Sequence, residues 1–290
     1  ALREAGDWRP YWNIWKCRIQ RRGCRRCAAA PFQTERRSGV FRTGGVMTEQ
    51  RLLSLVRQAV ERYGMIGEND RIAVGVSGGK DSLTLLYALA KLSSFYPKPF
   101  SVCGICVDLG LEGTDFDGIQ GFARELGVEL RIVPTQIGKI VLEEREEKNP
   151  CSLCSKMRKG ALVREALNMG CGKIAYAHHK DDFVETMLMS LIFQGRFYAF
   201  PPVTWFEDTG LQILRPLMLA EERQIRGFCR KYAVPVVKSP CPVDGTTSRA
   251  YAKELLRQIC AEHPEAKNRM FRALTEGGIE DWPQPGGKRE

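Results

Sequence analysis

The stretch that decides the fold is Ser77-Gly78-Gly79-Lys80-Asp81-Ser82, which lies between two apolar segments of different character. Residues 71–76 (RIAVGV) are rich in β-branched side chains and do not alternate with polar ones, which predicts a strand buried on both faces. Residues 83–90 (LTLLYALA) are rich in Leu and Ala, which favours a helix. The segment is therefore predicted to be a strand, a tight turn and a helix.

The turn has the properties of a phosphate-binding loop. Its two adjacent glycines allow left-handed backbone angles and a close approach to a ligand, and the N–H groups at a helix start favour an anion. The Walker A loop requires four residues between its glycines, followed by Lys and then Ser or Thr, and this loop departs from that spacing. The sequence predicts a different loop for phosphate or pyrophosphate; a Ser-capped glycine turn is the less favoured interpretation.

Length and composition allow one large α/β domain or two small ones. The 290 residues have ample apolar content for a core. No run approaches the roughly 18 to 20 apolar residues of a membrane helix, so no membrane association is expected. The chain has eleven cysteines and no evident secretory signal, which favours a reducing cytoplasm over a disulfide framework. Five of these cysteines are expected to be small buried hydrophobic residues: Cys103, Cys106, Cys171, Cys229 and Cys260.

The net charge of +10 is concentrated at one end of the chain. Residues 1–46 carry eleven Arg and Lys against three acidic residues, a net charge of +8, which leaves +2 for the remainder. This leader lacks apolar periodicity, so it is predicted to be disordered or to lie upstream of a true start at Met47. Alternatives are an organelle targeting peptide, half a zinc site at Cys24 and Cys27, or an Arg cluster that contacts RNA.

From residue 47 to about 275, predicted strands alternate with predicted helices, and a flexible Pro/Gly-rich tail follows at 276–290. This order predicts an α/β fold, a parallel twisted sheet with helices on both faces, ending in further C-terminal helices. In such Rossmann-like folds the ligand lies beyond the carboxyl ends of the strands. The predicted strands span 71–76, 100–107, 128–133, 173–177 and 211–214. The predicted helices span 49–63, 83–90, 115–126, 155–168, 182–193, 220–232, 248–261 and 264–274. Residues 137–147 are predicted to be a short helix or a loop, and 234–237 an extended piece.

Three cysteines lie in positions that core packing does not explain. Cys151 and Cys154 precede the basic predicted helix 155–168, and Cys241 lies between two prolines. A structural zinc site usually has four Cys or His ligands, and a thioredoxin-like dithiol would leave Cys241 unused. An iron–sulfur cluster held by three thiolates uses all three.

The segment Ala177-His178-His179-Lys180-Asp181-Asp182 ends a predicted strand and opens a helix. Asp181 can hold Mg²⁺ or contact a nucleotide, and Asp182 can cap the helix. The simpler interpretation is that both acids only complement the helix dipole. The two histidines are not expected to bind metal, and His178 is expected to form local hydrogen bonds.

A loop with many aromatic residues follows. Its side chains either stack on RNA bases or form a lid packed on the sheet. The loop contains Phe193, Arg196, Phe197, Tyr198, Phe200, Pro201, Pro202, Trp205 and Phe206. Cationic residues on later helices are compatible with a tRNA backbone, and also with ordinary solvated faces: Arg226, Arg230, Lys231, Arg249, Lys253 and Arg257.

Four features occur in a fixed order along the chain: SGGKDS, CSLCSKMRKG, AHHKDDFVET and a loop cysteine. With these motifs, residues 47–274 resemble the tRNA 2-thiocytidine synthetase family of PP-loop ATP-pyrophosphatases. The resemblance implies the PP-loop fold of the adenine nucleotide alpha hydrolases. It implies that Ser77–Ser82, Arg158, Ala177 and Asp181 bind ATP, with Lys80, Asp81 and Asp181 catalytic and Mg²⁺ on the phosphates. It also implies that Cys151, Cys154 and Cys241 ligate a [4Fe-4S] cluster. Asp244 stands where family members often have another cysteine.

The implied activity is adenylation of the C2 oxygen of a tRNA pyrimidine, cytidine in the anticodon loop above others, followed by its replacement with sulfur. The sulfur that enters the tRNA is held at the cluster or as a cysteine persulfide, and a protein such as a cysteine desulfurase would supply it. A homodimer is compatible with the resemblance. One alternative is an amine ligase similar to lysidine synthetase, which has no use for three thiols. Another is a metal-dependent or redox-sensing RNA-binding module without enzymatic activity.

Overall fold

The computed structural model describes residues 47–111, 113, 115–144, 150–237, 241, 248–277 and 282. All of them belong to the compact unit Gly45–Glu290. The predictions for the leader 1–46, for Asp244 and for most of the tail concern residues outside this set and stay predictions.

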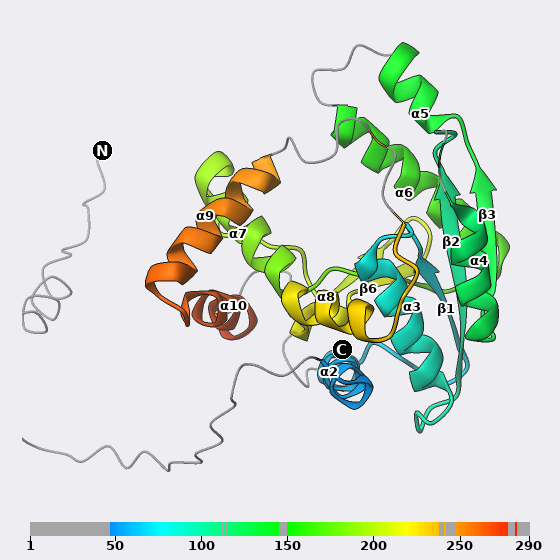
Figure 1. Cartoon of the computed structure of the whole chain (residues 1–290), viewed down its shortest axis with the longest axis horizontal. Coiled ribbons are helices and arrows are strands. Elements are labelled where there is room, and N and C mark those ends of the chain that lie inside the picture. The colour runs from blue at the N-terminus through cyan, green and yellow to red at the C-terminus, as the bar shows by residue number, and fades with distance from the viewer. Residues whose placement is uncertain are drawn as a thin grey trace, which may run out of the picture. The chain divides into compact units, whose positions relative to one another are not determined.

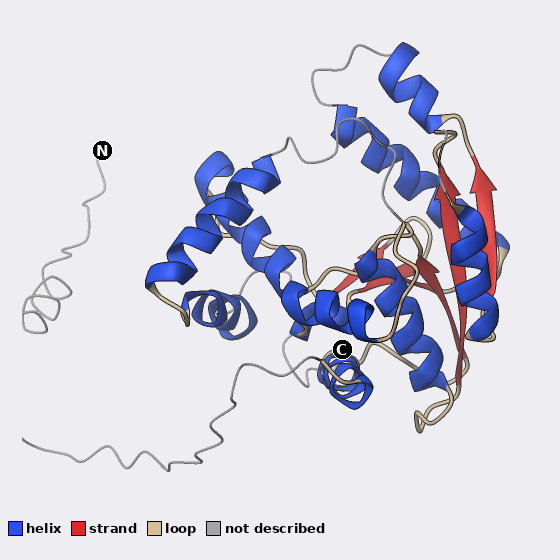
Figure 2. Ribbon diagram, viewed as in Figure 1, coloured by secondary structure: helices blue, strands red, loops and turns tan. Residues whose placement is uncertain are grey.

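The described residues form a six-stranded sheet in the order β3-β2-β1-β4-β6-β5 (Figures 1 and 2). The strand before the glycine turn, β1, lies inside the sheet and pairs in parallel with β2 on one side and with β4 on the other. This confirms the predicted mostly parallel sheet. The strands are β1 Asp70–Gly75, β2 Phe100–Asp108, β3 Glu129–Pro134, β4 Lys173–Ala175, β5 Val203–Phe206 and β6 Leu211–Leu214.

Helices cover both faces of this sheet, as predicted. On one face α3 contacts β1 and β2 and is itself packed by α2 and α8. On the other face α6 lies over β2 and β4. The helices are α2 Glu49–Arg62, α3 Lys80–Ser93, α4 Phe116–Glu125, α5 Ile137–Lys139, α6 Pro150–Asn168, α7 Lys180–Gln194, α8 Glu222–Lys231, α9 Ser248–Glu262 and α10 Ala266–Glu276, with a π-helical turn at Ile140–Glu144 and a 3₁₀ turn at Pro216–Leu219.

The first helix shows how local sequence sets these elements. The Thr48 hydroxyl accepts a hydrogen bond from the Arg51 N–H at 3.2 Å, which caps the start of α2 as predicted. Its apolar stripe, which includes Leu52 and Val56, is fully buried. α2 therefore closes one side of the main core.

Three predictions about the elements need correction, and a fourth holds in a different form. Val203–Phe206, assigned to the aromatic loop, is the edge strand β5, antiparallel to β6. Helix α6 begins at Pro150, since proline suits the first helical position, so Cys151 and Cys154 lie within its first turns. Asp182 caps α7 as predicted, but from the first turn and not from the N-cap position: its carboxylate accepts from the N–H of the cap residue His179 at 2.9 Å, as in a capping box. Residues 234–237 form no strand.

The strand order places the two predicted ligand loops side by side. β2 and β3 extend from one edge of β1, whereas β4 and β6 extend from the other, so the order in which successive strands are added to the sheet reverses between β1 and β4. Ligands of such sheets bind at this switch point, beyond the carboxyl ends of the strands. The loop 76–79 leaves β1 there, and 176–179 leaves β4 beside it. No helix among the described residues is long and apolar enough to cross a membrane.

Candidate active site

The phosphate loop is held by its own side chains. The Ser82 hydroxyl accepts from the Ser77 N–H at 3.1 Å and donates to the Gly79 carbonyl at 3.0 Å. Gly79 caps α3 without a side-chain acceptor, so the N–H groups of the first helical turn remain available to an anion. The loop is thus closed on itself, and its donors sit at the positive end of a buried helix.

Gly78 explains why glycine is needed in this loop. Its φ is +77°, which residues with a Cβ rarely adopt. A Cβ there would lie 3.0 Å from Ile119 Cδ1 and 3.3 Å from Val237 Cβ. The Gly78 carbonyl also accepts a hydrogen bond from the Val237 N–H at 2.9 Å. The chain that leads to Cys241 is therefore bound directly to the phosphate loop.

Lys80 lies between two carboxylates. Its Nζ is 2.8 Å from Asp81 Oδ2 and 3.2 Å from Glu222 Oε1, at the start of α8. Burial lowers the pKa of Lys80, but these two carboxylates outweigh it and raise the pKa, so the amine stays charged. Burial raises the pKa of Glu222, whereas Lys253 and Lys80 lower it more, to about 2. A permanent positive charge therefore stands beside the loop.

The two carboxylate oxygens of Asp81 have different surroundings. Its Oδ2 holds Lys80, while the buried Oδ1 has no hydrogen-bond partner among the described residues and lies 3.7 Å from His179 Nε2. A buried carboxylate oxygen normally has a partner. Asp81 can therefore accept a further donor or a cation at the switch point.

Asp181, the other predicted acid, is occupied by the protein itself. Its Oδ1 accepts from Lys267 Nζ at 2.8 Å, and its Oδ2 accepts from the Glu222 N–H at 2.8 Å. Lys267 also contacts Glu221 at 2.9 Å. Burial raises the pKa of both carboxyls, but Lys267 reverses this, so both pKa values are lowered. This arrangement fixes the start of α8, and with it Glu222, against α7.

Replacing Lys267 with Met should destabilise the protein by about 3 kcal/mol at neutral pH, because two poorly exposed carboxylates lose their cation. Folding lowers the pKa of Asp181 and Glu221, so their pairs stabilise the protein above about pH 4 and this is lost as the pH falls through the lowered values. In the variant, protonation in acid neutralises the two unpaired carboxylates and removes the cost of burying their charge. The difference in the free energy of unfolding should therefore shrink in acid.

Urea unfolding of both proteins at neutral pH and near pH 4 measures this difference. Lys139 is the control: it lies 4.0 Å from Glu144 with a side chain 59% exposed, so Lys139→Met should change stability by less than about 0.5 kcal/mol. An equal loss for Lys267→Met at both pH values would contradict the proposed role of the pairs.

His178 is neutral and packed, in contrast to the predicted hydrogen bonding. Burial, with help from Arg215 and Arg249, lowers its pKa to about 3. Its ring lies 4.4 Å from that of Phe200, and its buried Nδ1 has no hydrogen-bond partner among the described residues. His178 therefore supports the loop after β4 by packing and leaves Ala177, the predicted nucleotide contact, at the switch point.

The three predicted cluster ligands act on one another. Cys151 and Cys154 are three residues apart in α6, hence on one side of the helix. Burial is the main cause of the raised pKa of Cys154; Cys241 and Cys151 raise it further, and Arg158 opposes them. Cys241 is distant in sequence, so this influence shows that the described chain brings it to the start of α6.

Among the residues described, no three Cys, His, Asp or Glu side chains stand at the spacing that a single metal ion needs. This is compatible with a cluster, because three thiolates on a [4Fe-4S] cluster bind three different iron atoms and stand farther apart than the ligands of one ion.

Arg158 connects the cysteines with the switch point. Its charge lowers the pKa of Cys154, of Cys106 in β2 and of Tyr176, which directly follows β4. It therefore lies at the carboxyl ends of the strands, where the resemblance implied a nucleotide contact.

The sequence left open whether the aromatic segment packs on the sheet or stacks on RNA, and its residues differ in this respect. Phe200 packs against Phe183 with ring centroids 4.6 Å apart, as a core residue does. Phe193, Phe197 and Trp205 remain about half exposed, at 55%, 45% and 47%. Several of the predicted tRNA-binding cations are in ion pairs within the protein: Arg226 with Glu222, Arg249 with Asp182 and Glu185, Lys253 with Glu222, and Arg257 with Glu254.

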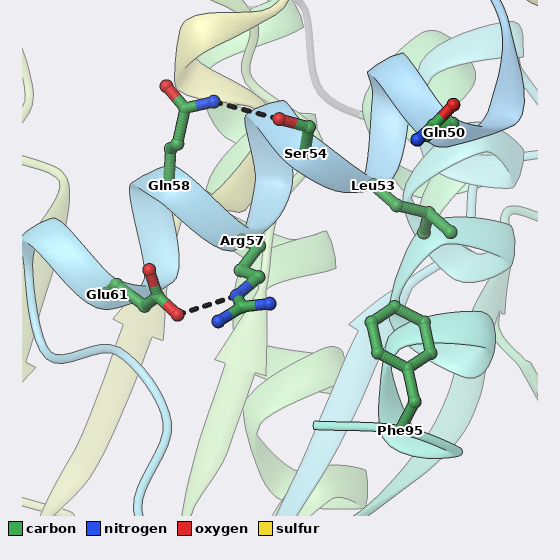
Figure 3. Close-up of a pocket in the computed structure, with 7 residues that line it drawn as sticks. All are labelled: Gln50, Leu53, Ser54, Arg57, Gln58, Glu61 and Phe95. Atoms are coloured by element: carbon green, nitrogen blue, oxygen red, sulfur yellow. Dashed lines mark hydrogen bonds and ion pairs between the residues drawn. The ribbon is translucent and has the colours of Figure 1, made fainter. Parts of the chain in front are cut away.

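A shallow hollow of about 460 Å³ lies elsewhere, between α2 and the residues after α3 (Figure 3). Arg57 and Glu61 form an ion pair at 2.7 Å on its wall, and Phe95 lines its other side. Phe95 follows the end of α3 opposite to Lys80, and a 14-residue helix is about 21 Å long. The hollow is therefore remote from the phosphate loop and plays no part in the site.

Glu222 and Lys267 are site residues that sequence reasoning did not identify. Each acts through a partner far along the chain, Lys80 and Asp181 respectively. The sequence signal was weak, because an acid in the first turn of α8 is equally explained by the helix dipole.

Comparison with known proteins agrees with this geometry. The family model described as a PP-loop domain matches residues 47–260. The tRNA-cytidine(32) 2-sulfurtransferases of Geobacter sulfurreducens and Geobacter metallireducens are 37% and 38% identical, covering 78% and 76% of this chain and 89% and 87% of theirs. The U34-tRNA thiolase NcsA from Methanococcus maripaludis, solved with its [4Fe-4S] cluster, has 25% identity and a TM-score of 0.63, over 80% of this chain and 81% of that one.

Proposed function

This chain belongs to the PP-loop family of tRNA-cytidine 2-sulfurtransferases, and from that premise we propose that it adenylates cytidine 32 of tRNA and replaces its C2 oxygen with sulfur. The enzyme class, an ATP-dependent tRNA sulfurtransferase, follows from the family. The position in the tRNA is taken from the names of the relatives.

One observation carries the proposal: the phosphate loop and the cysteines are joined. The Val237 N–H binds the Gly78 carbonyl at 2.9 Å, and Cys241 follows only four residues later, a span of at most about 14 Å. Cys241 in turn raises the pKa of Cys154. ATP on the loop and sulfur at the cysteines would therefore both reach one bound cytidine.

In the first step the C2 oxygen of cytidine attacks the α-phosphate of ATP, and pyrophosphate leaves. The free N–H groups at the start of α3 and the charged Lys80 stabilise the negative charge that develops on the leaving pyrophosphate. We propose that Asp81 would hold Mg²⁺ through its Oδ1, which has no hydrogen-bond partner among the described residues, and that the ion would offset negative charge on the phosphates. Asp181 contributes by fixing the start of α8 while Lys267 holds its carboxylate.

In the second step a sulfur nucleophile displaces AMP from C2. The donor set of Cys151, Cys154 and Cys241, three thiols, fits a [4Fe-4S] cluster. When bound, such a cluster supplies one iron without a protein ligand, at which the incoming sulfur can be held. A persulfide on one of these thiols is the other source left open by the sequence. Arg158 keeps Cys154 closer to its thiolate form.

Two further partners belong to the proposal. tRNA is the substrate, and sulfur arrives either as sulfide or as the persulfide of a cysteine desulfurase; the persulfide route also needs a second thiol, which supplies two electrons and ends in a disulfide. We also propose a cytoplasmic location and a homodimer as the assembly. The amine ligase considered above is disfavoured because it has no use for three thiols. The RNA-binding sensor is disfavoured because it has no use for an ATP-binding loop beside them.

The reaction itself tests the function. The full chain, reconstituted with iron and sulfide without oxygen, is incubated with ATP, Mg²⁺, sulfide and tRNA that lacks thionucleosides. AMP, pyrophosphate and 2-thiocytidine are expected to form together, as measured by mass spectrometry of the digested tRNA. Pyrophosphate release without a thionucleoside would favour an amine ligase, and no release at all would favour a sensor.

A further inference from the structure

A second pair of cysteines lies outside the proposed active site. Cys103 Sγ and Cys171 Sγ are 3.4 Å apart although the residues are 68 positions apart in the chain. Cys103 lies in the first half of β2 opposite Ala73 of β1, and Cys171 comes two residues before β4. Both side chains are buried. The pair lies toward the amino ends of the strands, whereas the phosphate loop lies at their carboxyl ends.

The surroundings of this pair differ from those of an inert core thiol. Burial raises the pKa of Cys106, in the same strand, to about 11. For Cys171 the hydrogen bond from Cys103 is the largest influence; Arg71 adds to it and outweighs burial, so its pKa is lowered to about 7. The pKa of Cys103 is raised by the same hydrogen bond and by burial. Either sulfur can donate the hydrogen bond between them, and the lowered pKa of Cys171 favours it as the thiolate of the pair.

The pair is also close to the surface. Arg71 interacts with both sulfurs and forms an ion pair with Glu129 at 3.2 Å, and the side chains of Arg71 and Glu129 are 44% and 53% exposed. We expect a small uncharged oxidant to reach the sulfurs when this exposed ion pair, which contributes little to stability, moves aside.

We propose that Cys103 and Cys171 form an oxidisable dithiol that closes to an intramolecular disulfide when the protein meets hydrogen peroxide. The Cys171 thiolate attacks one oxygen of peroxide, the O–O bond breaks, and Cys171 sulfenic acid and one water result. The Cys103 thiol then attacks the sulfenic sulfur, the S–O bond breaks, and a second water leaves. Two thiols are oxidised by two electrons in total, and one peroxide is reduced to two waters.

The disulfide would connect the two strands that flank β1. Cys103 lies in β2 and Cys171 precedes β4, and these strands pair with opposite edges of β1. The enclosed segment, 104–170, contains Cys151 and Cys154. Oxidation would therefore constrain the segment that carries two of the proposed cluster ligands without reacting with their sulfurs.

Peptide mapping tests the proposal on the full chain. The protein is treated with hydrogen peroxide, remaining thiols are alkylated in denaturant, and the tryptic peptides are analysed without reduction. Residues 165–173 carry Cys171 as their single cysteine, and residues 92–124 carry Cys103 and Cys106. Most of peptide 165–173 is expected to be recovered linked to 92–124, and to be released by a dithiol reductant.

Variants identify the linked sulfur. Cys106→Ser should keep the link, whereas Cys103→Ala should abolish it. The wild-type measurement alone is decisive if a variant fails to fold. Recovery of peptide 165–173 fully alkylated from peroxide-treated wild type would overturn the proposal, as would a link that persists in Cys103→Ala.

Discussion

Replacing Cys154 with Ser is expected to abolish sulfur transfer while ATP still binds. Cys154 is half-buried and is the thiol that responds to both Cys151 and Cys241, so its loss removes the middle member of the ligand set. Loss of even an outer partner of a metal ligand costs about 10- to 100-fold, so loss of a ligand should lower the thiolation rate by more than about 100-fold. The rate of 2-thiocytidine formation and the visible absorption of the reconstituted protein measure this effect.

Cys260→Ser is the matched control, because Cys260 is also half-buried but lies in α9, outside the ligand set. It should keep both the absorption and the activity. ATP binding, measured by calorimetry, should be unchanged in both variants, since the phosphate loop is intact. A Cys154→Ser protein that thiolates tRNA at the wild-type rate would exclude both the cluster and a persulfide at this residue.

Gly78→Ala should impair both stability and catalysis. The left-handed backbone costs a residue with a Cβ about 1 to 2 kcal/mol, and the new methyl group would press on Ile119 Cδ1 at 3.0 Å and Val237 Cβ at 3.3 Å. Relief requires the loop or the segment that leads to Cys241 to move. A displacement of about 1 Å at a reacting group can cost about 100-fold in rate, so AMP formation should fall by that order.

Gly170→Ala is the control that separates the cost of backbone strain from the effect of displacing the phosphate loop. Gly170 has a similar φ of +69°, with nothing within 4 Å of a built Cβ, in the turn after α6. It should lose about the same 1 to 2 kcal/mol in the free energy of unfolding and keep its kcat. If Gly78→Ala behaved like Gly170→Ala in both measurements, the loop geometry would not matter for the reaction.

The part of the fold that the sequence predicts correctly is the part set by local patterns. The β1–loop–α3 unit follows from a β-branched run, two glycines and a Leu/Ala-rich run, and α2 follows from Thr48 and its apolar stripe. Strand β5 was missed, since its four residues read as an aromatic loop and edge pairing with β6 is a tertiary feature. Helix α6 starts five residues before the predicted 155, because Pro150 is favourable as a first helical residue.

The candidate site shows the same division. The motif residues of the phosphate loop are contiguous, so their grouping needed no tertiary information. The contacts of Lys80 with Glu222 and of Asp181 with Lys267 join residues distant in the chain, and periodicity cannot predict such pairs. For the same reason the 3.4 Å approach of Cys103 and Cys171 was not foreseen, and both were predicted only to be buried.

The central claim is that one site couples ATP cleavage to sulfur insertion, and the ratio of AMP to 2-thiocytidine in the reconstituted reaction tests it most directly. The account predicts one AMP for each sulfur placed at cytidine 32, with both products absent when tRNA is omitted. AMP released with no sulfur in the tRNA, or 2-thiocytidine formed without ATP cleavage, would contradict it.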